Sequence, residues 1–215
     1  MTRAKICGVT TPEAYAAASD GGAAFIGLVS FAPSRRHLSV DQMQDLLAAV
    51  ERTAPVVVLT VDADDSHLAD IAARVRPEFI QLHGAETPER AQQVRALTGA
   101  GIIKAVPVSA AADIEAAREW DAVADHLLFD ARPPKGADRP GGLGHAFDWS
   151  LLADLKLSKP WFLAGGLTPD NVAAAIRQTA APLVDVSSGV ETTPGVKDSD
   201  LIRAFLDRVR DASSR

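Results

Sequence analysis

Residues 161–187, WFLAGGLTPDNVAAAIRQTAAPLVDVS, contain two short apolar runs separated by one segment with helical spacing. The apolar runs are WFLA (161–164) and LVDVS (183–187), and the helical segment is Pro169–Gln178. A strand, a helix and a second strand in this order form a unit whose strands pair in parallel through a right-handed crossover. The stretch therefore predicts an α/β protein.

The same alternation runs along the whole chain. The preceding apolar runs are AKIC (4–7), AFIGL (24–28), VVVLT (56–60), FIQLH (79–83), GIIKAV (101–106) and HLLFD (126–130). Other segments with helical spacing are Val40–Arg52, Ser66–Val75, Thr87–Leu97, Ala111–Trp120 and Ser199–Ala212. Eight strands in 215 residues give about 27 residues per unit, which is compact but sufficient for a (β/α)₈ TIM barrel.

The alternative architecture is an open, doubly wound parallel sheet. No G-x-G-x-x-G motif follows the first apolar run, and the count of eight strands favours closure. No change of composition marks a linker. We therefore predict one (β/α)₈ barrel domain over residues 1–215.

Three of the helical segments carry a start signal. Threonine, proline and an acidic residue follow one another at 11–13, 87–89 and 168–170. A threonine hydroxyl can cap a helix whose first residue is proline, and an acid suits the first turn. The pattern predicts helices that begin at Pro12, Pro88 and Pro169.

Composition excludes several classes of protein. The 22 Lys and Arg residues against 28 Asp and Glu residues give a net charge of −6, which argues against a nucleic-acid partner. A single cysteine excludes an internal disulfide framework and a cysteine-clustered metal site. The apolar run from Gly22 to Phe31 is about half the length of a membrane span, so we expect a soluble cytoplasmic protein without a membrane partner.

Polar side chains gather at the ends of the predicted strands. Residues two apart in a strand share a face, so Lys5 and Cys7 lie on one face of their strand, and Gln81 and His83 lie on one face of theirs. Asp130 and Asp185 lie near the ends of the sixth and eighth strands. We expect these side chains to point into the barrel at its C-terminal mouth, where barrel active sites are built.

Each of these residues also has a structural interpretation. Cys7 can be a small buried hydrophobe, and His83 a hydrogen-bonded structural histidine. Asp130 can brace the long loop that follows it, and Lys5 and Asp185 can form a buried pair that orders the barrel.

Glycine-rich segments follow the last two strands. They are Ala164-Gly165-Gly166 and Ser187-Ser188-Gly189. Backbone N–H groups in such loops bind phosphate, and the loops after strands seven and eight are the usual place for it in a barrel. These segments predict a phosphate site.

Two further loops suggest ligand contacts. Residues 131–146 form a long loop that contains Gly141-Gly142-Leu143-Gly144 and could close over a ligand. Ser34-Arg35-Arg36-His37 follows the second strand, where an arginine can hold a substrate carboxylate through two hydrogen bonds. The histidines outside the mouth show no metal-ligand spacing, so no metal site is expected.

Eight motifs in this order resemble the phosphoribosylanthranilate isomerase family of tryptophan biosynthesis along essentially the whole chain. They are KICG (5–8), FAPSRRHLS (31–39), QLHG (81–84), LLFD (127–130), GGLGHAFDW (141–149), LAGGLTPDNV (163–172), VDVSSGVE (184–191) and PGVKD (194–198). The resemblance implies a (β/α)₈ barrel that performs an Amadori rearrangement by general acid–base catalysis. It implies a small phosphorylated substrate and no cofactor or metal.

The resemblance also implies roles for individual residues. Cys7 matches the family's general base, Asp130 its general acid, and Arg36 the residue that holds the anthranilate carboxylate. We expect further substrate contacts from Gln81, His83, Gly142, Gly144 and Asp185, and phosphate contacts from Gly165, Gly166, Ser187, Ser188 and Gly189. The protein is expected to be a monomer or a homodimer.

Two loops depart from the family pattern. The second loop usually reads S-P-R-Y, whereas Arg35 and His37 replace its proline and aromatic residue here. In the sixth loop Leu143, His145 and Ala146 replace a hydroxyl residue, a lysine and a second hydroxyl residue. The expected acid and base are unaffected, so the departures concern efficiency rather than the type of reaction.

Two other functions compete with this interpretation. The histidine-pathway isomerase performs the same chemistry on a larger substrate, but it uses paired aspartates, whereas this chain has Cys7 at the end of the first strand. A non-catalytic barrel could bind a phosphosugar or a protein without turnover. Such a barrel would not require Cys7, Asp130 and Arg36 together.

Overall fold

The computed structural model describes residues 1–131, 148–153 and 155–213. Eight strands pair in parallel with their neighbours in the sequence, and the last strand pairs with the first to close a barrel. The strands are β1 (Arg3–Cys7), β2 (Phe25–Ser30), β3 (Val56–Thr60), β4 (Phe79–Leu82), β5 (Gly101–Val108), β6 (His126–Ala131), β7 (Trp161–Leu163) and β8 (Leu183–Val186). The predicted TIM barrel is confirmed.

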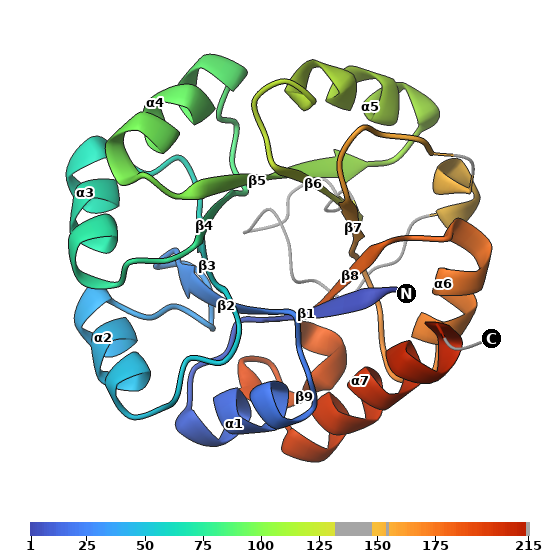
Figure 1. Cartoon of the computed structure of the whole chain (residues 1–215), viewed down its shortest axis with the longest axis horizontal. Coiled ribbons are helices and arrows are strands. Elements are labelled where there is room, and N and C mark those ends of the chain that lie inside the picture. Colours follow the sequence, from blue (N-terminus) through green and yellow to red (C-terminus); the bar gives the residue numbers. More distant parts are fainter. Residues whose placement is uncertain (132–147, 154, 214–215) are drawn as a thin grey trace.

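Helices form a ring around the strands (Figure 1). They are α1 (Pro12–Asp20), α2 (Val40–Ala48), α3 (Asp65–Arg74), α4 (Pro88–Thr98), α5 (Ala111–Ala116), α6 (Val172–Thr179) and α7 (Ser199–Ser213). Three short 3₁₀ helices are η1 (Ala117–Trp120), η2 (Trp149–Leu152) and η3 (Ser188–Val190). Among the residues with a described structure, no helix is long and apolar enough to cross a membrane.

Strand periodicity divides the core into two parts. Ile6, Ile80 and Val184 belong to the larger cluster between strands and helices, whereas Leu128 and Leu183 belong to a smaller cluster inside the barrel. Asp130 and Asp185 lie two positions after Leu128 and Leu183 and therefore share their inward face. The predicted inward orientation of the polar side chains is confirmed by the hydrogen bonds that join three of them across the interior.

Aromatic rings fill the N-terminal end of the barrel interior. Phe25 packs edge-to-face on Phe162, with ring centroids 5.3 Å apart, and on Phe79, at 5.7 Å. The His126 imidazole lies 5.5 Å from both Phe79 and Phe162. We call these four residues the ring cluster. It leaves the opposite end of the interior to polar side chains.

The helix start signals are right at two of three places. Thr11 and Thr87 cap α1 and α4, and each hydroxyl accepts a hydrogen bond from a backbone N–H of the first turn. The start predicted at Pro169 is wrong, because α6 begins at Val172.

The reason is that Asn171 fixes a turn before α6. Its side-chain oxygen accepts a hydrogen bond from the Thr168 N–H at 2.8 Å, and its Nδ2 donates to the Gly166 carbonyl at 2.9 Å. These bonds hold residues 168–171 outside the helix.

A small antiparallel hairpin follows β8 and was not predicted. Its strands are β9 (Glu191–Thr193) and β10 (Val196–Lys197). Gly195 in its turn has φ +94°, and a Cβ there would lie 2.8 Å from the Arg35 carbonyl oxygen. The hairpin therefore packs closely against the loop after β2.

Candidate functional site

The mouth of the barrel contains a fully buried ammonium group. Lys5 Nζ donates to Gln81 Oε1 at 2.7 Å and to Asp185 Oδ1 at 2.9 Å. Gln81 is as fully buried as Lys5. One cation thus links β1, β4 and β8. Lys5 and Asp185 form the buried pair that their structural interpretation described.

Charges around Lys5 and Cys7 shift both groups. Burial lowers the pKa of Lys5, but the Asp185 carboxylate, and Cys7 where it is ionised, outweigh burial and raise it, so Lys5 stays an ammonium. Burial raises the pKa of the Cys7 thiol, and the lowering by Lys5 and Lys197 does not offset it. Cys7 is therefore a thiol, not a thiolate, in the unliganded protein at neutral pH.

Gly27 on β2 makes room for these side chains. A Cβ at this position would lie 3.1 Å from the Cys7 Sγ and 3.1 Å from the Lys5 Cε. A glycine inside a strand marks such a close approach. Gly27 was not predicted as part of the site, because only the pairing of β1 with β2 reveals its neighbours.

A second polar line connects β4 with β6. Gln81 Nε2 and His83 Nδ1 are 3.0 Å apart, and His83 Nε2 lies 3.6 Å from Asp130 Oδ2. Asp130 Oδ1 accepts a hydrogen bond from the Ala131 N–H at 2.8 Å. The His83 and Asp130 side chains are 10% and 15% exposed, so both face the mouth, while Gln81 does not reach solvent.

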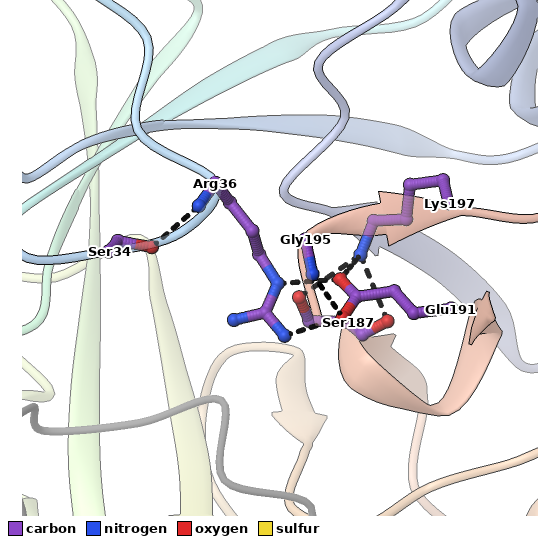
Figure 2. A network of polar contacts seen from close by, with 6 residues as sticks. All are labelled: Ser34, Arg36, Ser187, Glu191, Gly195 and Lys197. Carbon is purple, nitrogen blue, oxygen red and sulfur yellow. Dashed lines mark hydrogen bonds and ion pairs between the residues drawn. The ribbon is translucent and has the colours of Figure 1, made fainter. Parts of the chain in front are cut away.

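Arg36, in the loop after β2, is held by Glu191 of β9 (Figure 2). Arg36 Nε donates to Glu191 Oε1 at 2.6 Å, and Nη2 donates to Oε2 at 2.8 Å. This two-bonded contact fixes the plane of the guanidinium. Gly8, with φ +75°, lets Arg36 pass, because a Cβ there would overlap the Arg36 Cδ.

Lys197 of β10 completes the same cluster (Figure 2). Its Nζ donates to Glu191 Oε1 at 2.7 Å and to the Ser187 carbonyl oxygen at 2.9 Å. Burial raises the pKa of Glu191, but Arg36, Lys197 and the Gly195 N–H outweigh it and set the pKa at about 2. Burial lowers the pKa of Lys197, and Glu191 only partly restores it. We call Arg36, Glu191 and Lys197 the anchor cluster.

Glu191 and Lys197 were not predicted to have a role. Both lie within the motifs VDVSSGVE and PGVKD that carry the family resemblance, so the signal was present. The contact between Glu191 and Arg36, 155 residues apart, could not be read from their positions in the chain.

The glycine-rich loops after β7 and β8 touch each other. A Cβ on Gly189 would overlap the Leu167 carbonyl oxygen, so only glycine allows this approach. Gly165 and Gly166 both have positive φ, at +85° and +66°. A Cβ on Gly165 would lie 3.1 Å from Asp130 Oδ1, so the β7 loop also passes beside the expected acid.

Some expected contacts lie beyond these observations. Gly142 and Gly144, with the altered residues Leu143, His145 and Ala146, lie outside the described residues. Within residues 1–131, 148–153 and 155–213, no group of three or more His, Cys, Asp or Glu side chains could hold a metal ion.

Comparison with known proteins places this architecture in a family. A family model described as N-(5'-phosphoribosyl)anthranilate (PRA) isomerase matches residues 4–208. An N-(5'-phosphoribosyl)anthranilate isomerase from Caulobacter sp. (strain K31) is 51% identical over 212 residues, which are 98% of this chain and 99% of the relative.

Solved structures agree with the sequence matches. The crystal structure of phosphoribosyl anthranilate isomerase from Thermotoga maritima has a TM-score of 0.86 and 32% identity, and it covers 98% of this chain and 100% of its own. A phosphoribosyl anthranilate isomerase in complex with reduced 1-(o-carboxyphenylamino)-1-deoxyribulose 5-phosphate has a TM-score of 0.83 and 31% identity, with the same coverage.

Proposed function

Because this chain belongs to the N-(5'-phosphoribosyl)anthranilate isomerase family, we propose that Cys7 and Asp130 are the base and the acid of its reaction. The activity is the isomerisation of N-(5-phosphoribosyl)anthranilate to 1-(2-carboxyphenylamino)-1-deoxyribulose 5-phosphate, an Amadori rearrangement in L-tryptophan biosynthesis. One observation carries the assignment of roles. Cys7, Arg36 and Asp130 come from β1, the β2 loop and β6, and all three lie at the C-terminal mouth of the barrel.

The first step opens the ribose ring. Protonated Asp130 gives its proton to the ring oxygen while the bond from that oxygen to C1 breaks. The nitrogen lone pair forms the C1=N bond, which leaves a protonated imine and an Asp130 carboxylate. The half-buried position of Asp130 gives it access to a substrate in the mouth.

The second step moves a proton from C2. The protonated imine acidifies the C2–H bond, and the Cys7 thiolate accepts that proton. The C–H electron pair forms the C1=C2 bond, and the imine pair returns to nitrogen. The resulting enolamine tautomerises to the ketone, with loss of the hydroxyl proton and gain of a proton at C1.

Cys7 must first give its own proton to solvent water, since burial keeps it a thiol in the unliganded protein. The positive charges of Lys5 and Lys197 lower the pKa of the Cys7 thiol. Both cations favour the thiolate once the proton leaves. Lys5 and Lys197 therefore assist the base without reacting themselves.

Arg36 is proposed to hold the anthranilate carboxylate. Glu191 occupies Nε and Nη2, whereas Nη1 forms no hydrogen bond with any residue that the structure describes. Arg36 and Lys197 carry two positive charges against the single negative charge of Glu191. The anchor cluster thus has a net charge of +1, which a substrate carboxylate would neutralise.

The remaining expected contacts stay proposals. Gly165, Gly166, Ser187, Ser188 and Gly189 would bind the phosphate through backbone N–H groups and hydroxyls. His83, Asp185, Gly142 and Gly144 would contact the substrate. Gln81 is fully buried, so we propose that it supports His83 instead of contacting the substrate itself. We also propose a cytoplasmic monomer or homodimer that uses no cofactor and no metal.

The test is a fluorescence assay of freshly made phosphoribosylanthranilate, with an indole-glycerol-phosphate synthase to trap the product. We expect turnover by the native protein and, for Cys7→Ala and Asp130→Asn, a loss on the order of 10²–10⁴-fold. Asp45→Asn, at an exposed position of α2, is the matched control and should keep full activity. Full activity of folded Cys7→Ala would remove the base assignment.

A further inference from the structure

We propose that Gln81 is a positioning residue that fixes His83 as the tautomer with its proton on Nε2, and that Lys5 sets the orientation of Gln81. The three side chains form one line from β1 to the acid on β6. Lys5 Nζ is 2.7 Å from Gln81 Oε1, and Gln81 Nε2 is 3.0 Å from His83 Nδ1.

The direction of each hydrogen bond follows from the chemistry of the groups. An ammonium is a donor only, so the Gln81 atom that faces Lys5 must be the oxygen. The amide nitrogen then faces His83 and donates to Nδ1, which must carry a lone pair. In a neutral imidazole the proton therefore lies on Nε2.

The reversed amide is strongly disfavoured. It would turn two donors toward each other in a place where neither Lys5 nor Gln81 reaches solvent. The charge-assisted hydrogen bond from Lys5 to Gln81 would be lost. The buried ammonium would then keep its hydrogen bond to the Asp185 carboxylate alone of these two. The Lys5–Asp185 pair holds the ammonium in place, so the orientation of Gln81 is determined before substrate arrives.

The fixed tautomer has a consequence for Asp130, and this step rests on the proposed acid role. Asp130 Oδ1 already accepts the Ala131 N–H, so Oδ2 is the oxygen left for the transferable proton. When that proton leaves, the negative charge on Oδ2 faces His83 Nε2 at 3.6 Å. An N–H at this position stabilises the carboxylate, whereas a lone pair would repel it, and such contacts tighten when substrate binds.

The tautomer can be measured without substrate. Two-dimensional ¹H–¹⁵N spectra of the imidazoles distinguish a protonated nitrogen from an unprotonated one. The chain has five histidines, and His83→Asn identifies the His83 signals by their disappearance. We expect a protonated Nε2 and an unprotonated Nδ1 at pH above neutrality. The opposite tautomer, or a mixture, overturns the proposal.

Gln81→Glu tests the link to Gln81. A carboxylate accepts from Lys5 on one oxygen and offers an acceptor, not a donor, to Nδ1, so His83 should take up a proton on Nδ1. Gln92→Glu is the matched control, because it adds the same charge at an exposed position of α4. A His83 spectrum of folded Gln81→Glu identical with that of Gln92→Glu overturns the proposal. If Gln81→Glu does not fold, the native spectrum decides alone.

Kinetics separate this proposal from the assignment of the acid. We expect Gln81→Glu to lower kcat by on the order of tenfold with little change in KM, less than the loss for Asp130→Asn. A correct tautomer in a protein whose Asp130→Asn variant is fully active would remove the acid role and leave the positioning of His83 intact. An unchanged kcat in Gln81→Glu despite a changed His83 would overturn the catalytic consequence.

Discussion

The two ends of the barrel interior are built on the same faces of the same strands, yet their chemistry is opposite. On β4, Phe79 belongs to the ring cluster, and Gln81, two residues later, bonds Lys5. On β6, His126 packs among the phenylalanines, and Asp130 faces the mouth. The two-residue period of a strand determines which side chains face the interior. The position along the strand determines whether such a side chain is aromatic or charged.

The two ends are stable for different reasons. The ring cluster gains from apolar area and edge-to-face contact, which tolerate no cavity. The polar end depends on compensated charges, each of which leaves an unpaired partner when it is removed. Substitutions at the ring cluster should therefore affect stability alone, and those at the mouth should affect activity as well.

The largest effect is expected for Phe162→Ala, which removes a fully buried ring of the ring cluster. The free energy of unfolding should fall by about 3–5 kcal/mol, measured by denaturant unfolding, because a cavity is left. Below the melting temperature kcat should stay unchanged. Leu97→Ala, at an exposed apolar position, is the control and should cost less than about 0.5 kcal/mol. A changed kcat in Phe162→Ala would contradict the expectation that the ring cluster affects stability alone.

Glu191→Gln comes next, because it leaves Arg36 and Lys197 without their shared carboxylate. We expect a loss of roughly 2–3 kcal/mol in the free energy of unfolding. KM should rise by about tenfold, since Arg36 no longer has a fixed plane. Glu115→Gln, in an exposed pair with Arg118, is the matched control and should change neither value.

The same variant has a predictable pH dependence. The pKa of Glu191 is about 2 in the folded protein and near 4.5 when unfolded, so its ionised form is stabilised by folding. Its contribution is complete above pH 4.5 and disappears as pH falls through about 2. The difference in stability between native protein and Glu191→Gln should shrink over this range, and a constant difference would contradict the assignment.

Alkylation of Cys7 should show a smaller, graded effect. The chain has one cysteine, so iodoacetamide consumption reports Cys7 alone. Because burial raises the pKa of its thiol, the rate should rise about tenfold per pH unit through pH 9, whereas glutathione levels off near its own pKa. A plateau near pH 7 would show that the lysines outweigh burial.

The smallest effect is expected far from either end. Arg203 and Asp200 form an exposed pair on α7. Arg203→Ala should change the free energy of unfolding by less than about 0.5 kcal/mol and leave kcat and KM unchanged. A larger change would mean that a surface pair contributes as much as a buried one.

Much of the barrel could be predicted because it depends on local patterns. The run VVVLT was placed at residues 56–60, and β3 has those bounds. Inward faces followed from period two, which put Lys5, Gln81 and Asp185 on one side of their strands. Such features need only a few neighbouring residues.

What could not be predicted depends on contacts across the chain. Glu191 meets Arg36 only because the hairpin after β8 folds toward the loop after β2. A glycine is needed at position 27 because Cys7 and Lys5 approach it from the paired strand. At α6 a local rule failed, since Asn171 bonds the preceding loop and delays the helix.

The bond between Lys5 and Asp185 spans the seam where the first strand meets the last, 180 residues apart. During synthesis the ribosome releases Lys5 well before Asp185, at about 5–20 residues per second. Until β8 emerges, the ammonium lacks the carboxylate that makes its burial tolerable. We therefore expect the mouth of the barrel to form only after β8 is available to pair with β1.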